Sequence, residues 1–325
     1  MGGKTRCRAS ALGLVMSFLI AGLGLSVPAH ASQPVAECPD PTMLVDHWAQ
    51  PTVTLMCTGN GFPTRSASSI RQLSEARPHA AFAIGGWPTW THGGLWAPDL
   101  EHVGDQYLLY YSARLRSSRR HCLGLAVSDQ PDGGFRDLGA PLVDDGPDAA
   151  IDPALLSVDG QLILFYKLSG AVGAPSFIVG RLLSADGLTV VGPEVALLQS
   201  RPRGWEHRVV EGPAPIQVGD TTYLLYSEGR YYLSGYAEGE AERTGDPLGP
   251  FSRMSTAPVL RGGGRWVGTG GGSIVLDGSR MLLAYAAFRP GEPTLRRLLL
   301  VRELAFADGA VRPVGRPQEI RLRGP

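Results

Sequence analysis

Three acidic residues stand within two positions of a proline and lie far apart in the chain: Asp40, Asp152 and Glu211. Two carboxyl groups cleave a glycosidic bond with inversion when one protonates the leaving oxygen and the other deprotonates a water on the opposite face of the sugar. A third acid beside the proton donor raises the donor's pKa, because adjacent like charges resist double ionisation. If the three acids meet in one site, they predict inverting glycoside hydrolysis.

The elements that must bring these acids together repeat along the chain. Five segments share a short motif, an apolar strand, a turn with Gly or Asp, and a second strand rich in Tyr and Leu. The motifs are Pro39–Met43, Trp96–Leu100, Ile151–Leu155, Glu211–Pro215 and Gly270–Ile274. Aligning Pro41, Pro98, Pro153, Pro213 and Gly271 gives steps of 57, 55, 60 and 58 residues.

Repeats of this length, built from strands alone, indicate propeller blades. We therefore predict an all-β fold, a single five-bladed β-propeller over residues 32–325, with a β-sandwich of accidental internal similarity as the alternative. The innermost strand of each blade faces the central channel. Because each motif opens that strand, we expect the three acids to converge at one mouth of the channel, with Asp152 nearer Glu211 than Asp40.

The ordered motifs resemble glycoside hydrolase family 43 over roughly residues 38–305. The residues that carry the resemblance are Asp40-Pro41, Trp96-Ala-Pro-Asp99, Ile151-Asp-Pro153 and Val210-Glu-Gly-Pro213, supported by Gly134-Phe135 and Gly249-Pro-Phe251. The resemblance implies that Asp40 is the general base, Glu211 the general acid, and Asp152 the acid that tunes pKa and orients the substrate. The alternative is that each acid only caps a turn before a strand.

The fifth motif departs from the family pattern. The family commonly has Gly-His there, and that histidine lies under the sugar site, often near a calcium ion. Here Gly271 stands in its place, and a later Tyr-His of the family reads Tyr285-Ala286. No CxxC, HExxH or close histidine pair suggests another metal site. We therefore expect no cofactor, and the case for an internal calcium ion is weakened.

Four further residues are candidates for substrate binding. Trp87 and Trp96 precede the second repeat, and aromatic faces stack on sugar rings, although loop tryptophans as often plug a core. Arg208 precedes Glu211 and is a candidate for binding sugar hydroxyls, with a surface ion pair as the alternative. Asp99 has the weaker claim, because it lies one position beyond its proline, where the family usually has a structural acid.

Residues 1–31 have the pattern of a signal peptide, and we expect the protein to be secreted. Lys4, Arg6 and Arg8 precede the uncharged apolar run 11–25, and Ala29-His30-Ala31 supplies a cleavage site. The run is shorter than the ~20 apolar residues of a membrane span. The chain has 30 Lys+Arg and 30 Asp+Glu, without a basic stripe for nucleic acid. We expect a monomer that binds neither nucleic acid nor membrane.

The cysteines beyond the leader are odd in number: Cys38, Cys57 and Cys122. An antiparallel hairpin would bring Cys38 and Cys57 together, so we expect a disulfide between them and a buried free thiol at Cys122.

The expected substrate is a polysaccharide or oligosaccharide that contains arabinose or xylose. Family members include α-L-arabinofuranosidases, endo-arabinanases and β-xylosidases, and the sequence does not choose among these activities. The alternative is a sugar-binding propeller with weak or no catalysis. Fructan-cleaving propellers are not favoured, because their Asn-Asp-Pro-Asn start is absent.

Overall fold

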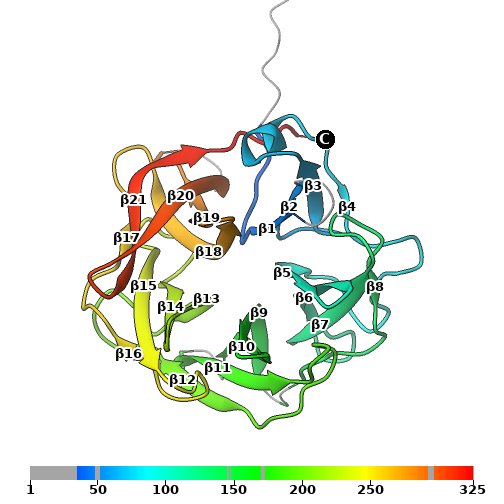
Figure 1. Cartoon of the computed structure of the whole chain (residues 1–325), viewed down its shortest axis with the longest axis horizontal. Helices are drawn as coiled ribbons and strands as arrows, with labels where there is room; N and C mark the ends of the chain where they lie inside the picture. The colour runs from blue at the N-terminus through cyan, green and yellow to red at the C-terminus, as the bar shows by residue number, and fades with distance from the viewer. Residues whose placement is uncertain are drawn as a thin grey trace, which may run out of the picture. The chain divides into compact units, whose positions relative to one another are not determined.

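The computed structural model describes residues 35–47, 52–144, 146, 148–169, 173–291 and 296–324. The expected leader at 1–31 lies outside these residues. Five antiparallel sheets surround a central axis (Figure 1), which confirms the five-bladed β-propeller. The one helix among the described residues is the 3₁₀ turn η1 (Ile70–Ser74), and no helix there is long and apolar enough to cross a membrane.

The strands of each blade are consecutive in the chain and run from the axis outward. The first blade contains β1 (Thr42–Asp46), β2 (Thr52–Met56), β3 (Pro63–Ala67) and β4 (His79–Ala80). The second contains β5 (Trp96–Val103), β6 (Gln106–Arg114), β7 (His121–Ser128) and β8 (Arg136–Asp137). The third contains β9 (Ala149–Val158), β10 (Gln161–Ser169), β11 (Ser176–Leu183) and β12 (Val195–Gln199).

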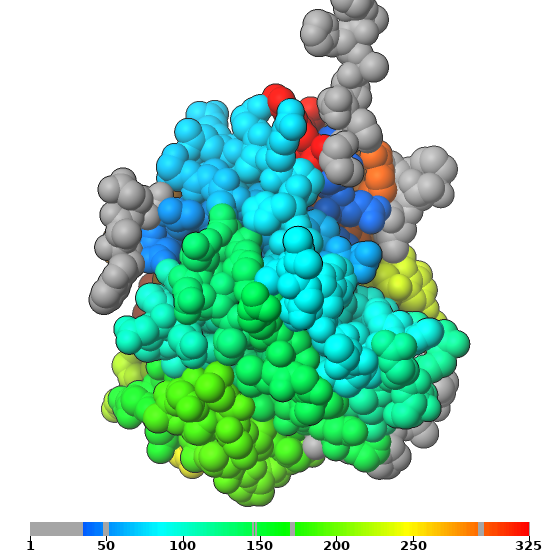
Figure 2. Space-filling model, turned by 90° about the vertical axis from the view of Figure 1, so that its right-hand side faces the viewer, coloured from blue at the N-terminus to red at the C-terminus, as the bar shows by residue number. Residues whose placement is uncertain are grey.

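The fourth and fifth blades complete the ring. The fourth contains β13 (Val210–Val218), β14 (Thr221–Glu228), β15 (Ala237–Thr244) and β16 (Ser252–Arg253), with β17 (Leu260–Arg261) also paired to β15. The fifth contains β18 (Val267–Asp277), β19 (Arg280–Phe288), β20 (Leu298–Ala307) and β21 (Ala310–Glu319). On the face shown in Figure 2 the colours run from blue and cyan at the top, through green, to yellow-green at the bottom, so the first half of the chain follows its sequence order around this side.

The hydrophobic core is divided among the five interfaces between neighbouring blades. Each blade presents alternate apolar residues on both faces, so every sheet contributes to two of the five clusters. Burying one leucine-sized side chain contributes about 2 kcal/mol. Such side chains at all five interfaces hold each innermost strand at the axis.

The ring closes between the first and fifth blades without exchanging a strand. Met43 and Leu55 pack there in one cluster with Val275 and Leu282. Beside them the first described residues pair with the last, because the Ala36 N–H donates to the carbonyl of Leu322 at 2.8 Å. The expected Cys38–Cys57 disulfide is present at this closure, and Cys122 is the expected buried free thiol.

The innermost strands share a backbone distortion at their channel ends. One equivalent residue in each blade has a positive φ, and the fifth blade has a second one at Gly268 (61°); the equivalent residues are Asp40 (45°), Ala97 (44°), Asp152 (58°), Gly212 (54°) and Gly271 (63°). Pairing register shifts at this point in the four blades where the residue lies within the strand. Gly271 therefore matches the residues before the prolines, so the alignment of Gly271 with the prolines was wrong by one position.

We predict that the disulfide stabilises the ring closure. Replacing Cys38 and Cys57 together by alanine should lower the free energy of unfolding by about 3 kcal/mol, as expected for a closed loop of about twenty residues. Urea denaturation followed by tryptophan fluorescence measures the loss. Cys122→Ala is the matched control, because it removes a cysteine but leaves the disulfide in place. Equal urea midpoints for the double variant and wild type would contradict the prediction.

Candidate active site

One cavity lies among the channel ends of the innermost strands. Asp40, Asp152 and Glu211 all line it, from the first, third and fourth blades. The three acids that sequence reasoning singled out therefore meet in one place. Glu211 stands one residue before the positive-φ position, which Asp40 and Asp152 occupy. The longer glutamate side chain reaches the cavity from that earlier position.

The carboxylate of Asp40 is held by two donors. Arg297 Nη1 lies 2.8 Å from Asp40 Oδ1, and Thr58 Oγ1 donates to Asp40 Oδ2 at 3.0 Å. The Arg297 side chain is buried, while that of Asp40 remains 27% exposed. An ion pair on one side and solvent access on the other suit a carboxylate that accepts a proton from water.

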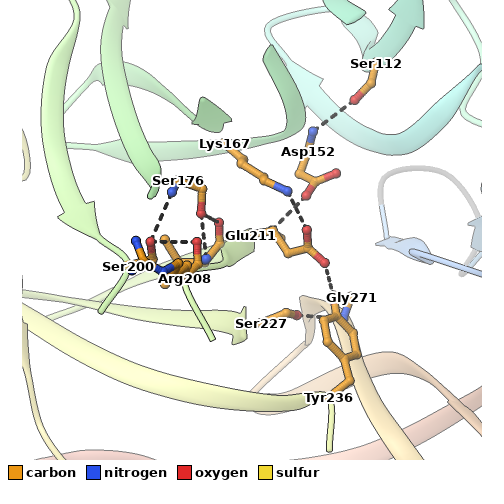
Figure 3. A network of polar contacts seen from close by, with 12 residues as sticks. Ser112, Asp152, Lys167, Ser176, Ser200, Arg208, Glu211, Ser227, Tyr236 and Gly271 are labelled. Carbon is orange, nitrogen blue, oxygen red and sulfur yellow. Dashed lines mark hydrogen bonds and ion pairs between the residues drawn. The ribbon is translucent and has the colours of Figure 1, made fainter. Parts of the chain in front are cut away.

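Asp152 is held through its backbone and its side chain. Its N–H donates to Ser112 Oγ at 2.9 Å, and its Oδ2 accepts the N–H of Gly212 at 3.0 Å (Figure 3). Because Gly212 follows Glu211 in the chain, this bond fixes Asp152 beside Glu211. The charge of Glu211 also affects Asp152 more strongly than that of Asp40 does. The structure thus agrees with the expectation that Asp152 is nearer Glu211.

Both carboxyl oxygens of Glu211 have partners. Lys167 Nζ lies 2.6 Å from Oε2, and the hydroxyl of Tyr236 donates to Oε1 at 2.8 Å (Figure 3). Lys167 comes from the end of β10, and Tyr236 directly precedes β15. The Glu211 side chain is only 13% exposed, so these contacts determine its orientation.

The charges around the cavity are distributed unevenly. Asp40 has an arginine at contact distance and Glu211 has a lysine, whereas the side chain of Asp152 accepts a hydrogen bond from the neutral N–H of Gly212. Burial first, and then the negative charge of Glu211, raise the pKa of Asp152 to about 7. The site therefore combines two carboxyl groups that contact a cationic side chain with one buried acid whose pKa is raised.

Arg297 occupies the space beside Gly271 that the family's histidine would need. A Cβ on Gly271 would lie 2.6 Å from Arg297 Nη2 and 2.5 Å from Asp40 Oδ1, so a side chain there would displace this ion pair. The positive φ of Gly271 further disfavours a side chain. A guanidinium group repels cations, and Gly271 has no side-chain oxygen that could bind one, so these residues do not fit a calcium ion. Within the described ranges no group of three or more His, Cys, Asp or Glu residues could hold a metal.

Of the four residues expected to bind substrate, Asp99 alone lines the cavity. Its Oδ2 accepts the N–H of Leu155 at 2.8 Å, which ties the second blade to the third. Burial, opposed by that bond, raises the pKa of Asp99 to about 7. Asp99 thus has the contacts of a structural acid.

The other three candidates lie outside the cavity lining. Trp96 stacks on His121 with ring centroids 4.0 Å apart, and Trp87 packs on Phe82 at 5.3 Å. The Arg208 side chain is exposed, although its carbonyl accepts the Ser200 hydroxyl at 2.9 Å (Figure 3). These residues are engaged with neighbouring protein groups or with solvent.

Sequence reasoning missed four residues that surround the acids: Lys167, Tyr231, Tyr236 and Arg297. Tyr231 lines the cavity with a ring that is half exposed, and Arg297 lies 5.6 Å from its centroid. A signal was available for Lys167, which is the one lysine after residue 4. The contribution of Arg297 left no local signal, because it comes from the far end of the chain.

Comparison with known proteins gives consistent matches. The sequence signature of "Glycosyl hydrolases family 43" matches residues 32–311. A "Probable arabinan endo-1,5-alpha-L-arabinosidase A" of Aspergillus flavus is 31% identical over 242 residues, 68% of this chain and 72% of that protein. An "Extracellular endo-alpha-(1->5)-L-arabinanase 1" of Bacillus subtilis is 28% identical over 238 residues, covering 66% and 67%.

Among solved structures, that of a "thermostable family-43 glycoside hydrolase" matches with a TM-score of 0.76 and 25% identity. The match covers 90% of this chain and 96% of that one.

We predict that the buried proton of Asp152 makes stability depend on pH. The folded protein retains this proton up to about pH 7, whereas an unfolded aspartate releases it near pH 4. Unfolding thus releases a proton in this window, and wild type loses up to roughly 1.4 kcal/mol of stability per pH unit as pH rises. Asp152→Asn lacks this loss, so its stability relative to wild type should increase from pH 4 to pH 7.

Urea denaturation at several pH values measures this difference. The matched control is Asp308→Asn, at an exposed turn, whose stability should run parallel to that of wild type. A parallel curve for Asp152→Asn as well would show that Asp152 ionises normally in the folded protein.

Proposed function

This chain belongs to the glycosyl hydrolases of family 43 and is thus a glycoside hydrolase; we propose that it cleaves α-1,5-linked arabinan outside the cell with inversion. The observation that carries the mechanism is the convergence of Asp40, Asp152 and Glu211 from three blades around one cavity. The three acids have different partners: Arg297 pairs with Asp40, Lys167 pairs with Glu211, and Asp152 accepts the Gly212 N–H.

In the proposed reaction Asp40 is the general base and Glu211 the general acid. Asp40 removes a proton from a water molecule, whose oxygen forms a bond to the anomeric carbon. The bond from that carbon to the leaving oxygen breaks, and its electron pair goes to the oxygen, which takes the proton of Glu211. Asp152 holds Glu211 through the Gly212 N–H and, while protonated, adds no negative charge beside it.

The proposed substrate rests on the relatives. Two proteins named for cleavage of α-1,5-linked arabinan each match about two thirds of this chain. Tyr231 is the proposed stacking surface for an arabinose ring, because its ring is half exposed at the cavity. The word "Extracellular" in the name of the Bacillus relative and the leader pattern at 1–31 support secretion.

The two proposed roles predict different responses to the leaving group. Glu211→Gln keeps the shape of the side chain but has no proton to transfer, so kcat on arabinan should fall by at least ~10²-fold. The loss should be much smaller on nitrophenyl arabinofuranoside, whose leaving group needs little protonation. Asp40→Asn should impair both substrates equally, because water must be activated in either case.

Steady-state assays with both substrates measure these ratios. A Glu211→Gln variant as active as wild type on arabinan would contradict the proposal. If wild type shows no turnover but calorimetry detects an arabino-oligosaccharide, the protein is a binding module instead.

The stereochemical outcome is a second prediction. Direct attack by water, with base and acid on opposite faces, should give a product with the opposite anomeric configuration. Proton NMR in the first minutes of the reaction, before mutarotation, distinguishes the two configurations. Retention of configuration would mean that a carboxylate forms a covalent intermediate, which the assignment of Asp40 as a base does not allow.

A further inference from the structure

Lys167 is the one lysine that the chain uses after residue 4. The 30 Lys+Arg residues include just two lysines, Lys4 and Lys167, so every other cation beyond the expected leader is an arginine. Lys167 is also buried, with 9% of its surface exposed. Lysine is almost never buried unless it is paired, and here its partner is Glu211 at 2.6 Å.

The equivalent position in three other blades carries a hydroxyl. Thr58, Ser112 and Ser227 each accept the backbone N–H of the positive-φ residue in the next blade, namely Ala97, Asp152 and Gly271. Lys167 has no acceptor atom. Between the third and fourth blades the Gly212 N–H therefore donates to Asp152 Oδ2 and not to a hydroxyl. The ammonium of Lys167 donates to Glu211. This exchange of a hydroxyl for an ammonium sets the arrangement of both acids (Figure 3).

We propose that Lys167 is a positioning residue that sets the acid strength of Glu211, by stabilising the carboxylate that Glu211 becomes when it protonates the leaving oxygen. The inference rests on the proposed role of Glu211 as general acid. An ammonium fixed before the reaction stabilises developing negative charge without reorganisation. The same opposite charge favours the ionised form of a carboxyl group in contact with it, so removing the ammonium should weaken the acid.

Other titratable groups that face Glu211 do not replace Lys167. They come from several elements packed around it and are Asp152, Tyr236, Glu238 and Arg297. The guanidinium of Arg297 bonds Asp40, and the other three groups are acids or a phenol, which carry no positive charge. Burial lowers the pKa of Lys167, but Glu211 and then Asp152 outweigh burial and leave the pKa raised, so the lysine stays charged.

The pH dependence of the reaction separates this role from a merely structural one. Lys167→Met keeps the length of the side chain but removes its charge, which makes Glu211 a weaker acid. On arabinan kcat should fall about 10²-fold, and the alkaline limb of kcat/KM should move up by about one pH unit or more. Lys167→Arg keeps the charge and should restore the limb to its wild-type position. On the nitrophenyl substrate the loss should be small.

An unchanged alkaline limb in folded Lys167→Met would overturn the inference. If that limb is unchanged while Glu211→Gln responds to the leaving group as expected, the inference fails and the proposed function stands. If Glu211→Gln stays fully active on arabinan, both fail.

A second measurement needs no activity and no folded methionine variant. The secreted chain, from which the expected leader is absent, has Lys167 as its one lysine, so labelling with ¹³C at the lysine ε-carbon gives one signal. Loss of that signal in Lys167→Arg assigns it. It should titrate above the usual range of a lysine, and Glu211→Gln should lower its pKa. Titration in the usual range, unchanged by Glu211→Gln, would overturn the inference.

Discussion

The cavity that the three acids line depends on the backbone distortion at the channel end of each innermost strand. A regular strand directs successive side chains to opposite faces. At the distortion one residue adopts a positive φ, and in the first and third blades that residue is an aspartate that lines the cavity. A non-glycine residue in this conformation costs of order 1 kcal/mol, although aspartate tolerates it better than most. The packed interfaces between blades hold this strain in place.

The distortions also connect neighbouring blades. In three blade pairs a hydroxyl beside one distortion accepts the N–H of the following one, as from Asp152 to Ser112 and from Gly271 to Ser227, and in a fourth pair Asp152 Oδ2 accepts the Gly212 N–H. The same bonds that hold the ring together therefore orient the acids. A shift of one blade would move an acid relative to its neighbours, which explains why the site is built on the rigid centre of the fold.

Burying three carboxyl groups in one cavity requires compensation for their charge. Arg297 pairs with Asp40 and Lys167 with Glu211, while Asp152 retains its proton near neutral pH. Ion pairs in a low-dielectric site offset the cost of removing charges from water only with good geometry and further hydrogen bonds. Thr58 and Tyr236 supply those bonds here. Arg297 also fills the space beside Gly271, so the missing histidine leaves no void at the site.

The sequence by itself determined the fold and the three acids, because both follow from a pattern that repeats within each blade. Strand periodicity, the repeat length and the acids beside prolines are local features, and they predicted five blades with Asp40, Asp152 and Glu211 together. The partners of these acids were decided by the tertiary structure alone. Arg297 reaches Asp40 across 257 residues of chain, and Lys167 reaches Glu211 across 44. Closure of the ring creates these contacts, so neither spacing nor composition specifies them. The tertiary structure also decided the positions of Trp87 and Trp96, which were candidates for sugar binding and which pack on Phe82 and His121 outside the cavity lining.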